Sequence, residues 1–160
     1  MGCTFSIRRA ASGDLFAIAE CLQKAFAPFR DLYTADAYND TVPNIEAIER
    51  RLLSMKIYVA VTDTNELVGT ISCNSVNAGE GHLRGMAVDP AWQGCGIGQE
   101  LLTTAESTLA KDGCSVISLD TTAPLERAIR FYEGNGFQRT GKVTDFFGMP
   151  LYEYAKKIIL

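Results

Sequence analysis

Hydrophobic residues recur along this chain with two periods, that of strands and that of helices. Short apolar runs predict strands near residues 5–7, 57–62, 67–75, 83–88, 115–119, 143–147 and 151–159. Apolar positions three or four residues apart predict a helix capped by Asp14, a second that begins near Thr41 and Pro43, a third from Ile97, and a fourth with Pro124 in its first turn. The order is strand, two helices, three strands, helix, strand, helix and two strands. It predicts an α/β fold of the α+β kind, with one mixed sheet and helices on both faces.

The segment Met86–Gly98 joins a predicted strand directly to a predicted helix. Its three glycines, Gly94, Gly96 and Gly98, lie at the N-terminus of that helix. The first N–H groups of a helix have no partner within it, and its dipole is positive at this end, so backbone alone can bind a phosphate. The absence of a Cβ lets the anion approach closely. The sequence therefore predicts an anion site at this junction.

The spacing of the glycines separates several kinds of phosphate loop. A GxGxxG pattern that began at Gly94 would need glycine at position 99, where the chain has Gln99, and no Gly-Lys-Ser/Thr sequence is present. A QxxGxG pattern remains, formed by Gln93, Gly96 and Gly98 after a Val-Asp-Pro sequence. This pattern resembles the acetyl-CoA-binding motif of the GNAT superfamily of N-acetyltransferases.

A second segment extends the resemblance toward the C-terminus. Residues 128–137 are similar to the family's Ala-Ile-x-x-Tyr-x-x-x-Gly-Phe sequence, so matching motifs cover about residues 83–137. Many members place an asparagine seven residues before the tyrosine, where this chain has Leu125, which leaves pantetheine contacts from that helix open. The resemblance implies a GNAT-like, mostly antiparallel sheet of about seven strands and one domain over residues 1–160.

The resemblance also implies roles for individual residues. The backbone N–H of Met86 would bind the thioester carbonyl, and Val88 would pair with pantetheine like an added strand. Tyr132 matches the tyrosine that protonates the departing thiolate. The implied binding residues for acetyl-CoA, as co-substrate, are Met86, Ala87, Val88, Gln93, Gly94, Cys95, Gly96, Ile97 and Gly98.

His82, the single histidine, is the favoured general base because an imidazole titrates near neutrality. It lies four residues before Met86, and this even spacing predicts that both side chains share one face of the strand. The resemblance places several members' catalytic Glu or His at this position. Glu80, Asp120 and Asp145 are alternative bases, directly or through water.

The variable segment between the first two predicted helices is the expected acceptor site. It combines aromatic and acidic side chains, which can hold an amine by cation–π contacts and ion pairs, and this favours a cationic small-molecule or peptide amine. A solvated loop anchored by its aromatic residues is the alternative. The residues are Pro28, Phe29, Arg30, Asp31, Leu32, Tyr33, Asp36, Tyr38, Asn39 and Asp40.

Composition narrows the class of protein further. A net charge of -4, with no basic run longer than two residues, argues against a nucleic-acid partner. One histidine and no CxxC pair argue against a metal site.

The five scattered cysteines are expected to be reduced thiols, with Cys95 facing solvent between two glycines. The chain shows neither a signal-peptide pattern nor an apolar run long enough to span a membrane, so we expect a cytoplasmic protein with no membrane partner. Its oligomeric state stays open between a monomer and a homodimer.

Three functions fit these observations. The favoured one is an acetyl-CoA-dependent N-acetyltransferase in which a primary amine attacks the thioester directly within a ternary complex. A non-catalytic acyl-CoA sensor and an interaction protein on the same fold are the alternatives. The presence of both His82 and Tyr132 favours catalysis.

Overall fold

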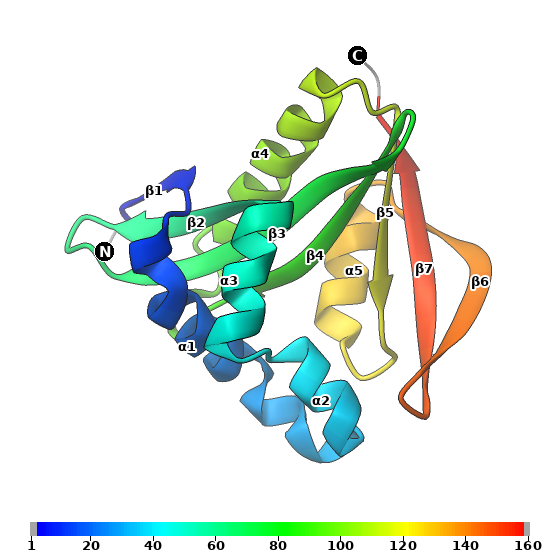
Figure 1. Ribbon diagram of the computed structural model, residues 1–160, viewed down its shortest axis with the longest axis horizontal. Coiled ribbons are helices and arrows are strands. Elements are labelled where there is room, and N and C mark those ends of the chain that lie inside the picture. The colour runs from blue at the N-terminus through cyan, green and yellow to red at the C-terminus, as the bar shows by residue number, and fades with distance from the viewer. Residues whose placement is uncertain (1–2, 159–160) are drawn as a thin grey trace.

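The computed structural model describes residues 3–158, in which seven strands form one sheet in the order β1-β2-β3-β4-β5-β7-β6. Neighbouring strands are antiparallel except β4 and β5, which are parallel (Figure 1). The predicted mixed, mostly antiparallel sheet of seven strands is confirmed. The strands are β1 (Phe5–Arg9), β2 (Lys56–Thr62), β3 (Leu67–Asn77), β4 (Glu80–Val88), β5 (Val116–Thr121), β6 (Gln138–Phe146) and β7 (Met149–Lys157).

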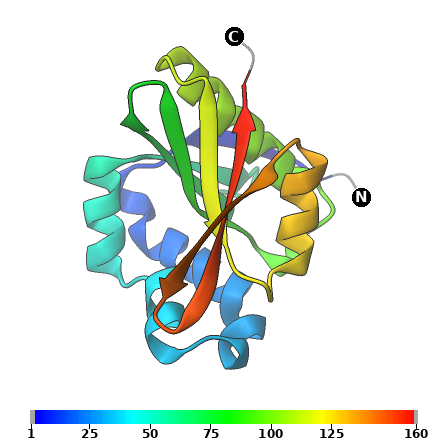
Figure 2. The same cartoon turned by 90° about the vertical axis from the view of Figure 1, so that its right-hand side faces the viewer.

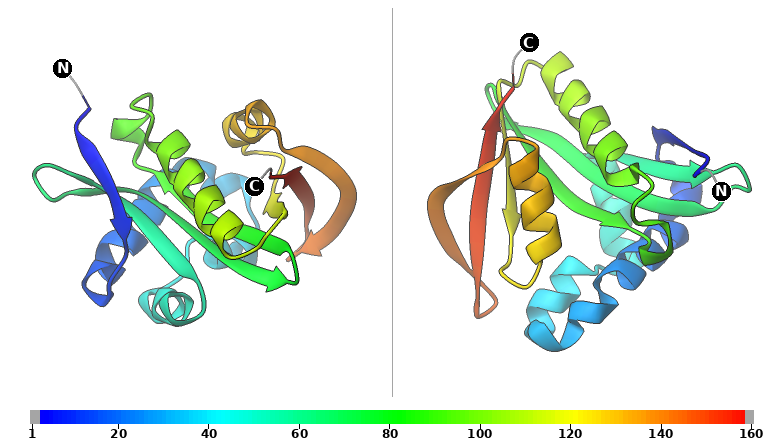
Figure 3. Two further views of the ribbon diagram at one scale, coloured as in Figure 1. Left: turned by 90° about the horizontal axis from the view of Figure 1, so that it is seen from above. Right: turned by 180° about the vertical axis from the view of Figure 1, so that it is seen from behind.

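Helices cover both faces of the sheet, as expected. In Figure 3, α1 and α3 lie on one face, and α4 and α5 lie on the other. Each face has its own apolar core, one that includes Leu22, Ile48 and Val59, and another that includes Leu101 and Ile117. The α-helices are α1 (Leu15–Phe26), α2 (Ala35–Thr41), α3 (Ile45–Ser54), α4 (Ile97–Lys111) and α5 (Glu126–Gly134).

The segment before α3 differs from the prediction. Residues 35–41 form the short helix α2, capped by Thr34, whose hydroxyl accepts from Ala37 N at 3.2 Å. Thr41 therefore ends one helix instead of beginning the next, and Asn44 caps α3. The polar composition of residues 35–41 hides this helix, because it buries only Ala37 and Tyr38.

Two further helix starts are corrected. Asp14 precedes α1, but its carboxylate does not cap that helix; it accepts from Ala11 N at 2.8 Å and pairs with Arg8 at 2.8 Å. Because both carboxylate oxygens bond these two partners, they are not available to the free N–H groups at the start of α1. Pro124 lies before α5, which begins at Glu126, so it is not in the first helical turn.

A β-bulge interrupts β4 at Gly85. Thr70 of β3 pairs with Ala87, and Ser72 pairs with Arg84, so two residues of β4 lie opposite one residue of β3. Gly85 has φ +61°, a left-handed conformation that glycine adopts without steric cost.

The bulge overturns the prediction that His82 and Met86 share a face. One extra residue reverses the alternation of side chains along the strand. His82 bonds Ser118 on the side of the sheet away from α4, whereas Met86 packs into the core that α4 covers. Even spacing in the sequence therefore places the two side chains on opposite faces.

Candidate active site

The glycine-rich loop lies at the start of α4, where the sequence predicts an anion site. Gly94 and Gly96 have φ of +84° and +82°, and a Cβ on either would meet no atom within 4 Å, so the space beside them is open. Gly96 is the N-cap, and the first bond of the helix runs from Glu100 N to Gly96 O at 3.1 Å. The N–H groups of the first turn are thus available to an anion.

Arg127 adds a positive charge beside this loop that the sequence motifs do not reveal. It lies in the first turn of α5 and donates from Nη1 to Gln93 Oε1 at 2.8 Å. Both residues line the cavity that runs past the loop. A guanidinium here can bind phosphate oxygens together with the backbone N–H groups.

Strands β4 and β5 separate beside the loop. Their pairing covers only three residue pairs and ends at His82 and Ser118, after which the strands diverge (Figures 1 and 2). The edge of β4 from Leu83 to Val88 therefore has no strand on its β5 side. Such an edge can pair with an extended ligand, which is the arrangement that the resemblance implies for pantetheine.

A cavity of about 760 Å³ extends from the glycine loop along the gap between β4 and β5 and is also lined by residues of α1, α2, α3 and α5. Eight of the nine residues implied to bind acetyl-CoA line this cavity, and Cys95 is the exception. Leu125 also lines it and presents an apolar side chain where many family members have an amide. The geometry therefore brings the predicted binding residues together.

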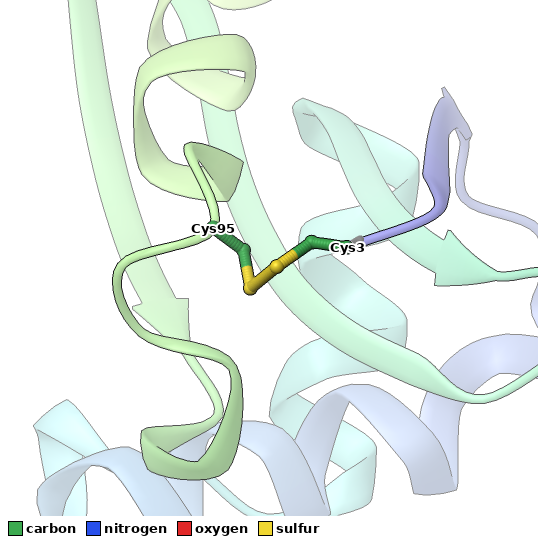
Figure 4. Close-up of a disulfide and its surroundings, with 2 residues drawn as sticks. All are labelled: Cys3 and Cys95. Carbon is green, nitrogen blue, oxygen red and sulfur yellow. A yellow bond between two sulfur atoms is a disulfide. The ribbon is translucent and has the colours of Figure 1, made fainter. Parts of the chain in front are cut away.

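Cys95 is not the solvent-facing thiol that we expected. It forms a disulfide with Cys3, 92 residues away, with the two Cα atoms 5.6 Å apart (Figure 4). The expectation of fully reduced cysteines is wrong for this pair, because the fold brings the segment before β1 alongside the glycine loop. Cys21, Cys73 and Cys114 are free and buried, as expected for cysteines that pack as small hydrophobic residues.

Tyr132 lies where a proton donor for the thiolate is expected. It lines the cavity on α5, and its hydroxyl donates to Met86 Sδ at 3.3 Å. Burial raises the pKa of this phenol above its usual value, so it keeps its proton at neutral pH. Edge-to-face contacts with Phe131 and Phe137 fix the ring.

His82 lies behind the cavity wall and does not line it. Its Nδ1 is 2.9 Å from the Ser118 hydroxyl, and its Nε2 is 3.7 Å from Asp120 Oδ2. Asp120 itself lines the cavity. Burial lowers the pKa of His82 and raises that of Asp120, and each partly opposes the other's shift. The pair can take up a proton from the cavity through the carboxylate.

The other alternative bases do not reach the cavity. Glu80 accepts from Asn77 Nδ2 at 3.2 Å, and Asp145 accepts from Gly148 N at 3.5 Å, and neither lines the cavity wall. Asp120 is thus the alternative that the fold brings to the site.

Only part of the predicted acceptor segment reaches the cavity. Of its ten residues, Tyr33 and Asp40 line the wall. Asp40 is engaged by Arg84 Nη2 at 3.1 Å, and Tyr33 bonds the Thr122 hydroxyl at 2.6 Å. The β6–β7 turn closes the same end, where Thr34 Oγ1 donates to the Phe147 carbonyl at 2.8 Å. Residues outside the predicted acceptor segment, such as Arg84, Thr122 and Phe147, therefore form more of this part of the cavity wall than the segment does.

Within residues 3–158, no group of three or more His, Cys, Asp or Glu side chains is placed to hold a metal ion. The helices of this range include none with the length and apolar character needed to cross a membrane.

The split sheet, the loop of exposed N–H groups and the adjacent phenol are the features that the resemblance to the acetyltransferase family implies. The Acetyltransferase (GNAT) family model matches residues 18–137, which is well over half of the chain, and the protein belongs to that family. Aminoglycoside N(6')-acetyltransferase type 1 of Stenotrophomonas maltophilia is 34% identical over 71 residues, covering 44% of this chain and 46% of that protein. The matched part thus spans about half the length of this relative.

Solved structures share the whole fold. The PaiA N-acetyltransferase of Thermoplasma acidophilum, in complex with coenzyme A, superposes with a TM-score of 0.81 at 21% identity, covering 97% of this chain and 99% of that chain. The ribosomal-protein-S18-alanine N-acetyltransferase of Escherichia coli gives 0.77 at 20% identity, covering 98% and 96%. At these identities the likeness shows the fold alone.

Proposed function

We propose that this protein transfers an acetyl group from acetyl-CoA to a primary amine of a small molecule or peptide, by direct attack in a ternary complex. One observation carries the proposal: a single cavity joins the exposed N–H groups at the start of α4, the free edge of β4 and the Asp120 carboxylate. The coenzyme A complex of the Thermoplasma neighbour and the N-acetyltransferase relative support it.

The binding step relies on backbone more than on side chains. The N–H groups of residues 96–98, together with Arg127, hold the pyrophosphate, and the free edge of β4 pairs with pantetheine. The Met86 N–H then donates a hydrogen bond to the thioester oxygen and stabilises the negative charge that develops there. These residues also fix the carbonyl carbon opposite the acceptor end of the cavity.

The chemical step needs a base and an acid on opposite sides of the carbonyl. Asp120, backed by His82, takes the proton of the attacking amine as the new C–N bond forms. The C–S bond breaks, and Tyr132 gives its proton to the departing thiolate. Burial raises the pKa of Tyr132, and the same removal from water disfavours an ionised thiolate beside it, so the proton passes to the sulfur as it departs.

Turnover and binding measurements test the proposal separately. We expect coenzyme A thiol to be released from acetyl-CoA when a panel of amines is added, and acetyl-CoA to bind in calorimetry without any amine. Binding without turnover on any amine would favour an acyl-CoA sensor. Absence of binding would refute the acyltransferase assignment.

We also propose that residues 1–160 act as one domain and that the enzyme is cytoplasmic. Disulfides are rare in that compartment, so the Cys3–Cys95 bond makes the location testable. Thiols should be alkylated in intact cells before lysis, and the modified cysteines identified by mass spectrometry. A Cys3–Cys95 pair that is fully oxidised in cells would contradict a reducing location.

A further inference from the structure

The acceptor end of the cavity contains an arginine that has no ion-pair partner among residues 3–158. Arg51, in the last turn of α3, lines the cavity together with Arg84 and Asp40. Asp40 is paired with Arg84 at 3.1 Å. Within residues 3–158, no carboxylate lies within 4.0 Å of the Arg51 guanidinium, and no side-chain hydrogen bond engages it.

The environment of Arg51 is unfavourable for a lone cation. Burial and the neighbouring charge of Arg84 lower its pKa to about 10, and Asp40 only partly opposes them. A guanidinium still keeps its proton at neutral pH, so loss of that proton does not relieve the cost of desolvation. Arg51 is partly buried, and charges withdrawn from water are ordinarily paired, so an anion from outside the chain would supply the missing partner.

The bulge in β4 places this charge beside the point of acetyl transfer. A Cβ on Gly85 would come within 2.7 Å of Arg51 Nη1, so the guanidinium packs directly against the glycine. The next residue is Met86, whose N–H is proposed to bind the thioester carbonyl. Covalent geometry then keeps Nη1 within about 7 Å of the Met86 nitrogen. An acceptor whose anion meets Arg51 therefore needs its amine only a few bonds away to reach the thioester carbon held at Met86.

From this placement, which rests on the proposed function, we infer that the acceptor is a small amino carboxylate, such as a free amino acid, whose carboxylate is bound by Arg51. The planar fork of the guanidinium can donate two parallel bonds to a carboxylate. Tyr33, Phe146 and Phe147 also line the cavity, and aromatic lining suits an apolar side chain on the amino acid. Peptide N-termini and simple amines lack the adjacent carboxylate.

The acceptor test compares matched pairs of amines. Aromatic amino acids, their methyl esters and the corresponding decarboxylated amines differ only at the group that would meet Arg51. We expect kcat/KM to be about 10- to 100-fold higher for the amino acid, the range for one charge-assisted contact. Equal values across each set would overturn the inference while leaving the acetyltransferase function intact.

Variants identify the residue responsible. Arg51→Gln should raise KM for amino acids by a similar factor, leave the affinity for acetyl-CoA unchanged and abolish the preference over esters. Arg51→Lys should restore part of the preference, since it keeps the charge without the fork. Arg50→Gln is the matched control, because Arg50 is an exposed neighbour on α3 that does not line the cavity. A loss of activity that is equal for amino acids and esters would refute the role of Arg51.

A binding measurement keeps the inference testable if no turnover is seen. N-acetyl amino acids and their amides should be titrated into the wild-type protein in the presence of coenzyme A. We expect the carboxylates to bind at least 10-fold more tightly, and Arg51→Gln to remove that difference. Equal affinities would overturn the inference whether or not the protein is an active transferase.

Discussion

Replacing Gly96 with alanine tests the backbone anion site most directly. Gly96 has φ +82°, so alanine there must adopt a left-handed conformation that costs about 1–2 kcal/mol. Its Cβ would meet no protein atom within 4 Å, so no steric clash within the protein adds to this cost. The methyl group would instead project into the open space proposed for the pyrophosphate.

Gly113, at the other end of α4, provides a matched control. It has φ +89°, and a Cβ there also meets nothing within 4 Å. Gly96→Ala and Gly113→Ala should therefore lose similar stability, with Tm lower by about 2–8 °C for a chain of this size. Only Gly113→Ala should keep full affinity for acetyl-CoA.

Calorimetry and thermal unfolding separate the two effects. We expect Gly96→Ala to weaken acetyl-CoA binding by about 10- to 100-fold, as when hydrogen bonds to a charged group are lost. The difference between the two variants, and not the loss in either alone, measures the contact with the anion. Equal affinities for acetyl-CoA in the two folded variants would refute the assignment of the loop.

The remaining predictions concern the proton donor, the disulfide and the base. Tyr132→Phe should slow the single-turnover rate while changing stability by less than about 1 kcal/mol, since only one weak bond to sulfur is lost; an unchanged rate would reduce Tyr132 to a packing residue. Reduction of Cys3–Cys95, or Cys3→Ser, should lower the free energy of unfolding by about 4–5 kcal/mol in the chain-entropy description, because the bond closes a loop over a 92-residue separation; denaturant titration with and without reductant measures this. Burial lowers the pKa of His82, which backs the proton acceptor Asp120, so the acidic limb of kcat/KM that reports this pair should lie below pH 6.5. Asp120→Asn removes the carboxylate that takes the amine proton and should slow turnover by about 100-fold or more; a variant that keeps its rate, or a limb that follows only the pKa of the acceptor amine, would contradict this assignment.

Much of the fold follows from local patterns that act within one element. The apolar face of α4, with Ile97, Leu101 and Leu109 among its members, is buried as the sequence predicts. Most strands are also found close to their expected places, because their apolar runs are bounded by turn residues, but β6 begins at Gln138, five residues before the predicted start. Helix α2 escapes prediction because its burial comes from the neighbouring elements and not from a periodic apolar face of its own.

The site is less predictable because it depends on contacts between distant parts of the chain. The pairing of Cys3 with Cys95 joins residues that no spacing rule relates. Arg51 reads in the sequence as one of many charged helix residues, and only the packing of α3 against β4 brings it into the cavity. Gly85 did offer a signal, since an isolated glycine within a strand suggests a bulge.

That single inserted residue organises both halves of the proposed reaction. By reversing the alternation along β4, the bulge turns Met86 toward α4 and α5, on the side of the glycine loop and Tyr132, while His82 stays on the opposite side with Asp120. The acid and the base are thereby separated by the sheet and face each other only across the gap between β4 and β5. The same bulge seats Arg51 against Gly85, on the side of the base. The thioester and the acceptor can then approach from opposite faces, and the amine reaches the carbonyl carbon only where the two strands part.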